Sequence, residues 1–229
     1  MTYHELKITA YLYNGFSNYD KNYLDIYNKQ LDLTESKDLV RVIKFLNQWG
    51  CRQFKKEDHT KASDSIQAWF YTYRSFFPKI GSLLFDQDDG QIRSYKEMFN
   101  ALMISHVSTR VFKSLNRKSA NNTVGPVGAA KILFALRRNT FPPWDGPVIK
   151  NLKFKKNGDG YCDFLVRIKQ DLLNIKEYCI QNAINFDDLP NLLDRPRSSF
   201  PKLADEYYWI KITKKYDPAK IIELSKSFR

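Results

Sequence analysis

The chain has few cysteines and no long hydrophobic run. Its three cysteines, Cys51, Cys162 and Cys179, are an odd number and lie far apart in the 229-residue sequence. They cannot supply a four-cysteine zinc or iron–sulfur site, and their scarcity suits a reducing compartment. A run of about 18 apolar residues, the minimum for a transmembrane helix, is missing. The first residues lack a charged segment followed by an apolar one, so we expect a cytoplasmic protein rather than a secreted one.

Acidic residues are also in short supply. Asp and Glu number 25 against 37 Lys and Arg, which gives a formal net charge of +12 and a pI near 9.5. Any single basic run is explained equally well by a solvated helix face, but together they favour a polyanion partner. A membrane-surface role is weaker, because no segment has the long amphipathic pattern of an anchor. The basic runs are 52–56, 110–118, 131–138, 150–156 and 211–215.

The remaining composition is that of a folded globular protein. Hydrophobic residues make up 43% of the chain and aromatic residues 15%, which is too much apolar content for a disordered basic tail. The length allows one domain or two closely packed lobes. We find no internal repeat, low-complexity linker or domain boundary. We therefore expect a single compact unit over residues 1–229, with a monomer as the default state.

Hydrophobic periodicity predicts a mostly helical protein. Residues 5–13 alternate roughly in polarity, which predicts a short strand or an extended lead-in. Residues 153–160 predict a basic, glycine-containing loop. Elsewhere, apolar stripes bounded by capping residues, glycine or proline predict helices. Their expected ranges are 18 or 20 to 30, 34–49, 58–76, 94–115, 127–138, 145–151, 163–183, 201–212 and 218–227.

Residues 123–150 contain the most informative pattern in the chain. Gly125 and Gly128 permit a sharp turn at the start of an amphipathic helix. Backbone N–H groups exposed at a helix N-terminus attract anions, and on so basic a chain a nucleic-acid phosphate is the expected anion. Residues 100–138 therefore predict a helix, a connecting segment, a glycine hairpin and a second helix. Beyond them, Asp145 lies in a loop rich in proline and glycine.

This stretch resembles the helix–hairpin–helix, Gly/Pro-rich loop, Asp (HhH-GPD) superfamily of DNA base-excision glycosylases. That superfamily includes endonuclease III, the adenine-mismatch glycosylase and the alkyladenine glycosylases. The hairpin at 124–129 has the sequence Val-Gly-Pro-Val-Gly-Ala, and Asp-Gly-Pro-Val follows at 145–148. Val127 precedes Asp145 by 18 residues (145 − 127), about the separation that the family shows. Lys150 lies where the family commonly has a basic residue, and the likeness is confined to residues 123–150.

The resemblance implies an all-α, two-lobed glycosylase fold with a helix–hairpin–helix motif, in which the N- and C-terminal segments form the second lobe. It implies a DNA glycosylase that hydrolyses the N-glycosidic bond of a damaged or modified base flipped out of double-stranded DNA. Asp145 would be the essential catalytic carboxylate, stabilising positive charge near C1′ and orienting the attacking water. An N-cap for the helix at 146–151 is the structural alternative for Asp145. The residues implied to contact the DNA backbone are Val124, Gly125, Val127, Gly128, Lys131 and Lys150.

The chain departs from the family in two respects. Bifunctional members have a hairpin lysine that forms a Schiff base with the sugar, whereas Val127 occupies the matching position here. We therefore predict a monofunctional enzyme; Lys131, one turn further on, is an alternative nucleophile, although a phosphate contact is its more ordinary role. The iron–sulfur cluster of some members is also missing. We predict no cofactor and no metal site.

A flipped base needs an aromatic pocket. Trp144, which adjoins Asp145, is the first candidate for its wall, and Trp69 and Tyr73 are further ones. The spacing of Trp69 and Tyr73 is equally typical of a buried helical stripe. The base itself stays open among alkylated, oxidised, deaminated, mismatched and phage-modified bases, in repair or in phage defence. Two other functions also stay open: a non-enzymatic helix–hairpin–helix DNA-binding protein, and a structural or RNA-binding module.

Overall fold

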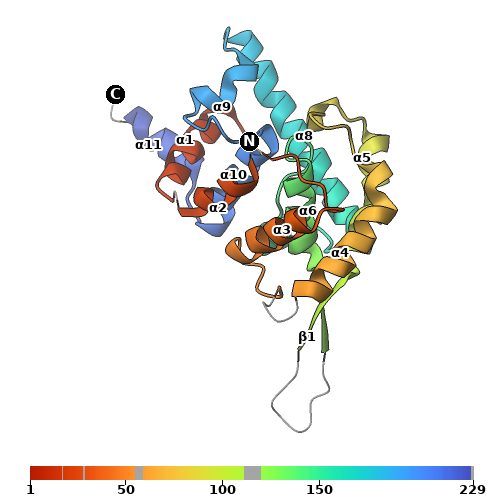
Figure 1. Cartoon of the computed structure of the whole chain (residues 1–229). Helices are drawn as coiled ribbons and strands as arrows, with labels where there is room; N and C mark the ends of the chain where they lie inside the picture. Colours follow the sequence, from red (N-terminus) through yellow and green to blue (C-terminus); the bar gives the residue numbers. More distant parts are fainter. Residues whose placement is uncertain (17, 28, 55–58, 111–119, 228–229) are drawn as a thin grey trace.

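The computed structural model describes residues 1–16, 18–27, 29–54, 59–110 and 120–227 (Figure 1). It is 68% helix and 3% strand, which confirms the predicted all-α class. Short 3-10 turns lie at 74–76, 84–86 and 186–188, and a π-helical turn lies at 209–213. The helices are α1 (Tyr3–Asn14), α2 (Asn18–Tyr27), α3 (Ser36–Gln48), α4 (His59–Tyr73), α5 (Asp89–Ile104), α6 (Gly125–Leu136), α7 (Gly146–Asn151), α8 (Gly158–Gln181), α9 (Leu189–Leu192), α10 (Phe200–Tyr208) and α11 (Pro218–Ser227); the strands are β1 (His106–Arg110) and β2 (Ala120–Thr123).

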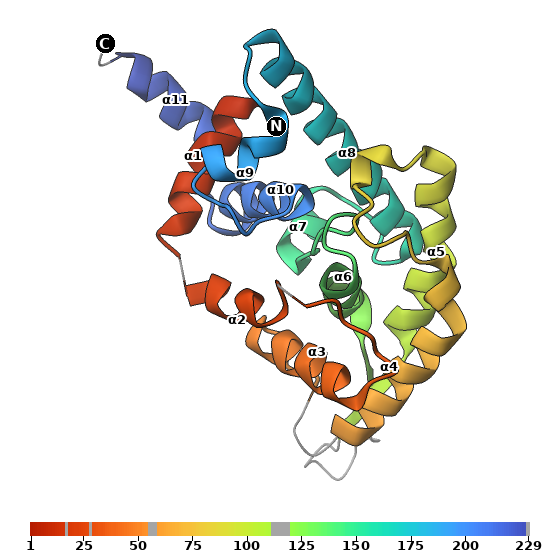
Figure 2. The same ribbon diagram turned by 45° about the horizontal axis from the view of Figure 1, so that its top comes forward.

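Helix α6 forms the centre of the molecule. Figure 2 shows it near the middle, with α2, α3, α4, α5, α8 and α10 arranged around it, and it packs directly against α3 and α5. Every residue from Gly128 to Leu136 is buried, so the helix is enclosed on all sides rather than amphipathic as predicted, and Lys131 is its one charged residue. Gly125 begins the helix with a positive φ of 68°, which glycine adopts without strain. The predicted glycine turn into a helix is therefore confirmed.

The two ends of the chain lie together on one side of α6. Helix α1 packs against α10 and α11, and Figures 1 and 2 both show these helices grouped away from α4 and α5. Helix α8 connects the two sides, because it contacts α5 along one part of its length and α1 and α10 along another. The terminal amino group of Met1 forms an ion pair with Asp171 of α8 at 3.2 Å.

The strand or extended segment predicted at residues 5–13 is wrong, because these residues belong to α1. A capping box begins this helix: the Thr2 side chain accepts from the Glu5 backbone, and the Glu5 side chain accepts from the Thr2 backbone. Such a reciprocal pair is a strong helix-start signal. The buried residues Leu6, Thr9, Ala10 and Tyr13 follow helical spacing, which decides against the apparent alternation.

The helix predicted at 94–115 is also wrong at both ends. Asp88 and Gln91 form a capping box that begins α5 earlier, and the helix ends at Ile104. Residues 106–110 then form β1, which pairs antiparallel with β2 and contacts α4; Val and Thr in this segment favour a strand. Residues 111–115 lie outside the described part of the chain. The strands β1 and β2 therefore lie between α5 and α6, in the stretch for which the sequence predicts a connecting segment before the glycine hairpin.

The remaining helix predictions are confirmed with shifts at their ends. Helix α3 begins at Ser36, two residues (36 − 34) after its predicted start. Helix α11 covers 218–227, as predicted. Helix α8 begins at Gly158, inside the predicted basic loop, because the Asn157 side chain caps it by accepting from Gly160 N–H. A Cβ at Gly160 would lie 2.0 Å from the Lys155 carbonyl oxygen. Glycine is therefore required where this loop turns into the helix.

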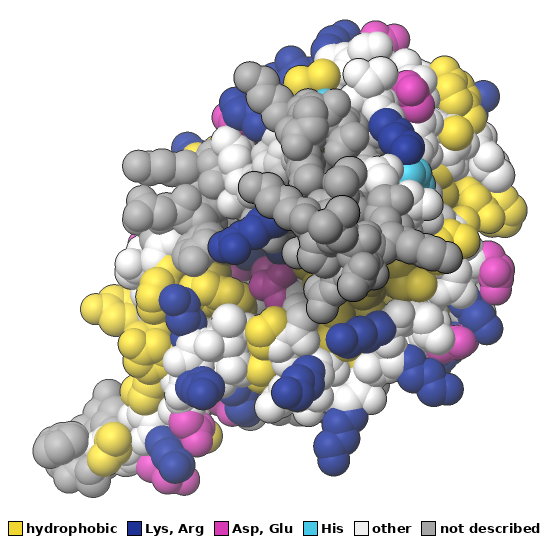
Figure 3. All heavy atoms as spheres, turned by 90° about the horizontal axis from the view of Figure 1, so that it is seen from below, with side chains coloured by type: hydrophobic (Ala, Val, Ile, Leu, Met, Phe, Trp, Pro, Cys, Tyr) yellow, Lys and Arg dark blue, Asp and Glu magenta, His cyan; other side chains and the backbone are white. Residues whose placement is uncertain are grey.

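Positive charge is spread widely over the surface. Figure 3 views the molecule from below, the side on which the β1–β2 hairpin projects in Figure 1. Lys and Arg side chains are dispersed over the described part of this face, between apolar and uncharged residues and with fewer acidic ones. This face provides a diffuse basic surface rather than a single basic stripe.

Candidate active site

Asp145 lies in the N-cap position of α7, with the extended backbone of a capping residue (φ −94°, ψ 150°). Among the residues that the structure describes, however, its side chain accepts no capping hydrogen bond. Its Oδ1 instead lies 2.9 Å from Nζ of Lys131, and the side chain is 27% exposed. The capping alternative therefore does not account for the direction of this carboxylate.

Lys131 is buried on α6, and its amino group points toward the Asp145 carboxylate. Its side chain is 7% exposed, and Nζ also donates to the Trp49 carbonyl at 2.8 Å. Burial by itself lowers the pKa of Lys131, but the charge of Asp145, with smaller contributions from Cys51 and Asp205, raises the pKa above its ordinary value. The group is therefore an ammonium at neutral pH. Its burial is not consistent with the phosphate contact that the sequence predicted for it.

A pocket of about 170 Å³ opens at this ion pair. Its walls come from α1, the end of α3, α6, the loop before α7, α10 and the π-helical turn at 209–213. It therefore lies where the two ends of the chain meet the central helix. The lining residues are Tyr13, Gln48, Trp49, Gly50, Lys131, Pro143, Asp145, Lys202, Asp205 and Trp209.

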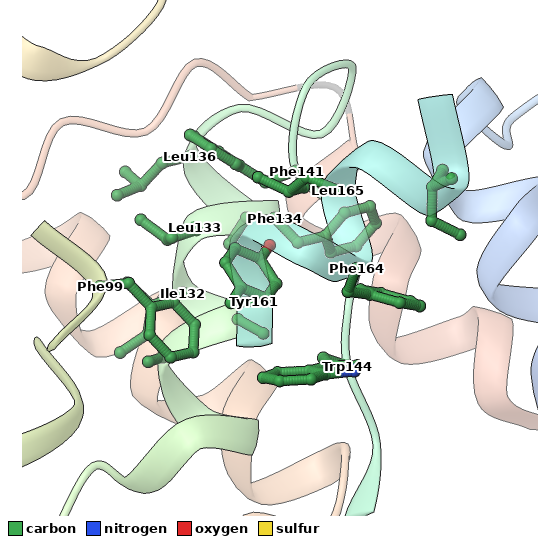
Figure 4. Close-up of a cluster of buried hydrophobic side chains, with 14 of the residues drawn as sticks. Phe99, Ile132, Leu133, Phe134, Leu136, Phe141, Trp144, Tyr161, Phe164 and Leu165 are labelled. Carbon is green, nitrogen blue, oxygen red and sulfur yellow. The ribbon is translucent and has the colours of Figure 1, made fainter. Parts of the chain in front are cut away.

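The structure places the three predicted base-pocket residues, Trp144, Trp69 and Tyr73, away from this pocket. Trp144 is fully buried and stacks on Phe164 within the hydrophobic core (Figure 4). Trp69 is also buried, with its indole N–H donating to the Met98 carbonyl at 2.9 Å, and Tyr73 stacks against it. None of the three is among the described residues that line the pocket.

The aromatic walls are Tyr13, Trp49 and Trp209. The rings of Tyr13 and Trp209 meet edge to face, with centroids 5.5 Å apart. Trp49 follows the last turn of α3, where its carbonyl binds Lys131. In the sequence, Trp144 is a candidate for the pocket wall because it adjoins Asp145. In the structure, the aromatic walls come from segments distant from Asp145 in the chain.

A second lysine–aspartate pair lines the pocket and was missed in the sequence. Nζ of Lys202 lies 3.0 Å from Oδ2 of Asp205 and 3.3 Å from Oε1 of Glu206. Arg195 binds both oxygens of Glu206, at 2.7 and 3.1 Å. Buried charges of this kind are tolerated because each is paired. The pKa of Asp205 is raised to about 6, chiefly by burial; the charge of Lys202 lowers this pKa, while the negative charges of Asp145 and Glu206 raise it. In the sequence, the signal for this pair is a set of charged residues, 202, 205 and 206, in a helix that is otherwise mostly apolar.

The hairpin residues divide into buried and accessible groups. Val124 and Gly128 are buried, and the Val124 carbonyl accepts from Nε2 of Gln53 at 2.7 Å. They build the turn, and their burial leaves no side-chain surface for a DNA contact. Gly125 and Val127 are partly exposed, and Lys150 is exposed on α7, so these three stay available for a backbone contact.

No protein-family model, curated protein or solved structure matches the chain. Within the described ranges, no helix has the length and apolar character needed to cross a membrane. The same residues hold no cluster of three or more His, Cys, Asp or Glu side chains placed to bind a metal ion. The chemistry of the pocket is therefore the main guide to function.

Proposed function

We propose that the protein is a DNA glycosylase that hydrolyses the N-glycosidic bond of a base flipped out of duplex DNA, with Asp145 as the essential carboxylate. The observation that carries the proposal is the position of this side chain. It sits in a helix N-cap position yet faces a pocket with aromatic walls, where Lys131 holds it at 2.9 Å. The likeness of residues 123–150 to the helix–hairpin–helix glycosylases adds support.

The chemistry of glycosidic hydrolysis suits one fixed carboxylate. As the base departs, positive charge develops near C1′ of the deoxyribose. A carboxylate beside that carbon stabilises the charge and accepts a proton from the attacking water. Lys131 acts as a positioning residue, because its buried ammonium orients Asp145. Loss of a preorganised electrostatic group of this kind slows catalysis by about 100- to 1,000-fold.

The size and walls of the pocket suit a single planar base. Its volume of about 170 Å³ is below the range of about 300–1,000 Å³ that drug-sized ligands occupy. The rings of Tyr13, Trp49 and Trp209 offer stacking surfaces of the type that hold flipped bases.

The charge of the molecule suits a DNA substrate. The net charge of +12 and the dispersed basic surface favour a phosphate backbone, which supplies most of the non-specific affinity in protein–DNA complexes. Partly exposed Gly125 at the start of α6 and exposed Lys150 on α7 lie on the two helices that flank the Asp145 loop. We propose these two residues as contacts to the DNA backbone. A monomer and a monofunctional mechanism remain part of the proposal.

The proposal is tested by incubating the protein with a panel of oligonucleotide duplexes that carry alkylated, oxidised, deaminated, mismatched or hypermodified bases. Alkali then cleaves the strand at each abasic site. We expect base release from at least one duplex, a loss of about 100- to 1,000-fold in Asp145→Asn, and nearly unchanged duplex binding by that variant. Asp163→Asn is the matched control, because it removes a half-exposed carboxylate that is paired with Arg93 at 2.6 Å on the surface.

The outcome that would contradict the proposal is duplex binding without base release from any member of the panel. The protein would then be a non-enzymatic DNA-binding protein. Preference for single-stranded RNA over duplex DNA in a salt titration would indicate an RNA-binding module instead.

A further inference from the structure

We propose that Asp205 is a second catalytic residue, which donates a proton to the departing base while Asp145 acts on the sugar and the water. The substrate class follows from this role: a base that is neutral before it leaves, rather than an alkylated base that is already cationic. The inference rests on the proposed glycosylase function and deepens it.

The two carboxyl groups face one pocket from different parts of the chain. Asp145 comes from the loop before α7 and Asp205 from α10, and both line the pocket. The side chain of Asp205 is only 11% exposed. Each carboxyl has its own lysine, Lys131 at 2.9 Å and Lys202 at 3.0 Å. The pocket therefore has two distinct acid–base groups, as a reaction with a proton to accept and a proton to donate requires.

The charged and titratable groups around Asp205 come from several elements of the fold. Lys202 and Glu206 lie on α10 itself, Asp145 and Lys131 face it across the pocket, and Tyr161 of α8 also interacts with it. Tyr13 of α1 accepts from Lys202 at 3.3 Å. Burial and the two neighbouring carboxylates raise the pKa of Asp205 to about 6. Part of the population therefore holds the acidic proton near neutral pH, where a general acid is most effective.

The reaction balances with these two groups. The C1′–N bond breaks and its electron pair passes to the base nitrogen, while the proton of Asp205 bonds to the base. The oxygen of water bonds to C1′, and Asp145 accepts the proton that this water loses. The products are a neutral free base and an abasic sugar. Proton exchange with solvent then restores Asp205 to the acid form and Asp145 to the carboxylate.

The substrate class follows from the leaving group. A neutral purine or pyrimidine would depart as an anion unless it received a proton, so a general acid accelerates its release. N7-methylguanine already carries a positive charge and departs neutral without help. A general acid is therefore useful for the first class and irrelevant for the second.

The test compares release of neutral bases, hypoxanthine and uracil, with release of N7-methylguanine from otherwise identical duplexes. Single-turnover rates are measured from about pH 5 to about pH 9 for the unmodified protein, Asp205→Asn, Asp205→Glu and Asp145→Asn. The Asn variant is expected to fold, because Lys202 keeps Glu206 at 3.3 Å and Tyr13 Oη at 3.3 Å. Thermal unfolding of each variant checks this.

We expect Asp205→Asn to slow release of the neutral bases by about 100-fold or more and to leave N7-methylguanine release within a few-fold. The acid must be protonated, so the unmodified protein should lose rate on neutral bases as the pH rises past about 6. Asp205→Asn should lose that dependence, and Asp205→Glu should retain it with a shifted midpoint. Asp145→Asn should slow both classes.

Two results would overturn the role of Asp205 while leaving the glycosylase proposal intact. One is equal slowing of both base classes with an unchanged pH profile, and the other is release of N7-methylguanine alone by the unmodified protein. If Asp205→Asn does not fold, the shifted midpoint of Asp205→Glu decides, and an unshifted midpoint overturns the inference. Failure of the unmodified protein to release any base refutes the proposed function itself, and the inference with it.

Discussion

Lys131 and Asp145 should be energetically coupled in the folded protein, and a double-mutant cycle measures this without any substrate. Nζ and Oδ1 lie 2.9 Å apart, and the two side chains are 7% and 27% exposed. Lys131→Met removes the charge and keeps most of the aliphatic stem. Asp145→Asn removes the other charge with little change in shape. The cycle of these two variants isolates the contact between them.

The expected coupling lies between two known limits. A hydrogen bond to a charged group contributes about 1.5–3 kcal/mol, whereas an exposed ion pair contributes about 0.2–1 kcal/mol. Because Lys131 is buried and Asp145 is partly solvated, we expect a coupling of about 1–2 kcal/mol. Lys131→Met also removes the 2.8 Å hydrogen bond that Nζ donates to the Trp49 carbonyl. The total loss in free energy of unfolding for this variant should therefore reach about 2–4 kcal/mol.

Urea unfolding gives the free energy of unfolding of the unmodified protein, both single variants and the double variant. The four values can be compared if the free energy falls with urea concentration at the same slope in each. The surface pair Arg93–Asp163, with side chains 52% and 48% exposed, is the control cycle, made with Arg93→Met and Asp163→Asn. Its coupling should stay below about 0.5 kcal/mol. A coupling between Lys131 and Asp145 no larger than that of the control would show that the two groups do not meet in solution, and the site as described would be wrong.

Two further predictions concern the lysine and the glycines. The pKa of Lys131 is raised, so its amine is protonated and non-nucleophilic at neutral pH. Sodium borohydride should therefore trap no covalent protein–DNA complex during base release. A trapped complex that Lys131→Arg abolishes would contradict a monofunctional mechanism. Gly125→Ala should cost about 1–2 kcal/mol, because its φ of 68° is left-handed but a Cβ would meet open space. Gly160→Ala should cost several times more, because a Cβ would lie 2.0 Å from the Lys155 carbonyl oxygen; equal losses in urea unfolding would refute this difference.

Local signals in the sequence predicted most of the helices, and the errors arose where one local signal competed with another. The sequence predicts the helix at 218–227 because proline favours the first position of a helix. It predicts the turn at Gly125 because glycine permits a positive φ. At residues 5–13, alternation of polarity indicates a strand, whereas the Thr2–Glu5 capping box begins a helix there. After Ile104, apolar residues continue at helical spacing, but the chain enters β1 because pairing with β2 satisfies its backbone groups. Such pairing depends on a second segment, which periodicity within one segment does not detect.

The site was predicted in part for the same reason. The loop of Asp145 has its own sequence signature, but the walls of the pocket come from residues 13, 49, 131, 202, 205 and 209, which only the tertiary fold brings together. The one local inference about the walls, that a neighbour of Asp145 should share its pocket, failed for a geometric reason. Asp145 has extended backbone dihedrals, and successive side chains of an extended segment point to opposite sides.

Pro143 and Asp145 accordingly line the pocket, while Trp144 between them enters the core and stacks on Phe164 (Figure 4). In this extended segment, the immediate neighbour of the proposed catalytic residue is thus directed away from the pocket and is better placed to anchor the loop. The buried indole of Trp144 fixes the backbone at the point where Asp145 must be held. We therefore expect Trp144 to contribute to the site by positioning the Asp145 carboxylate rather than by binding a base.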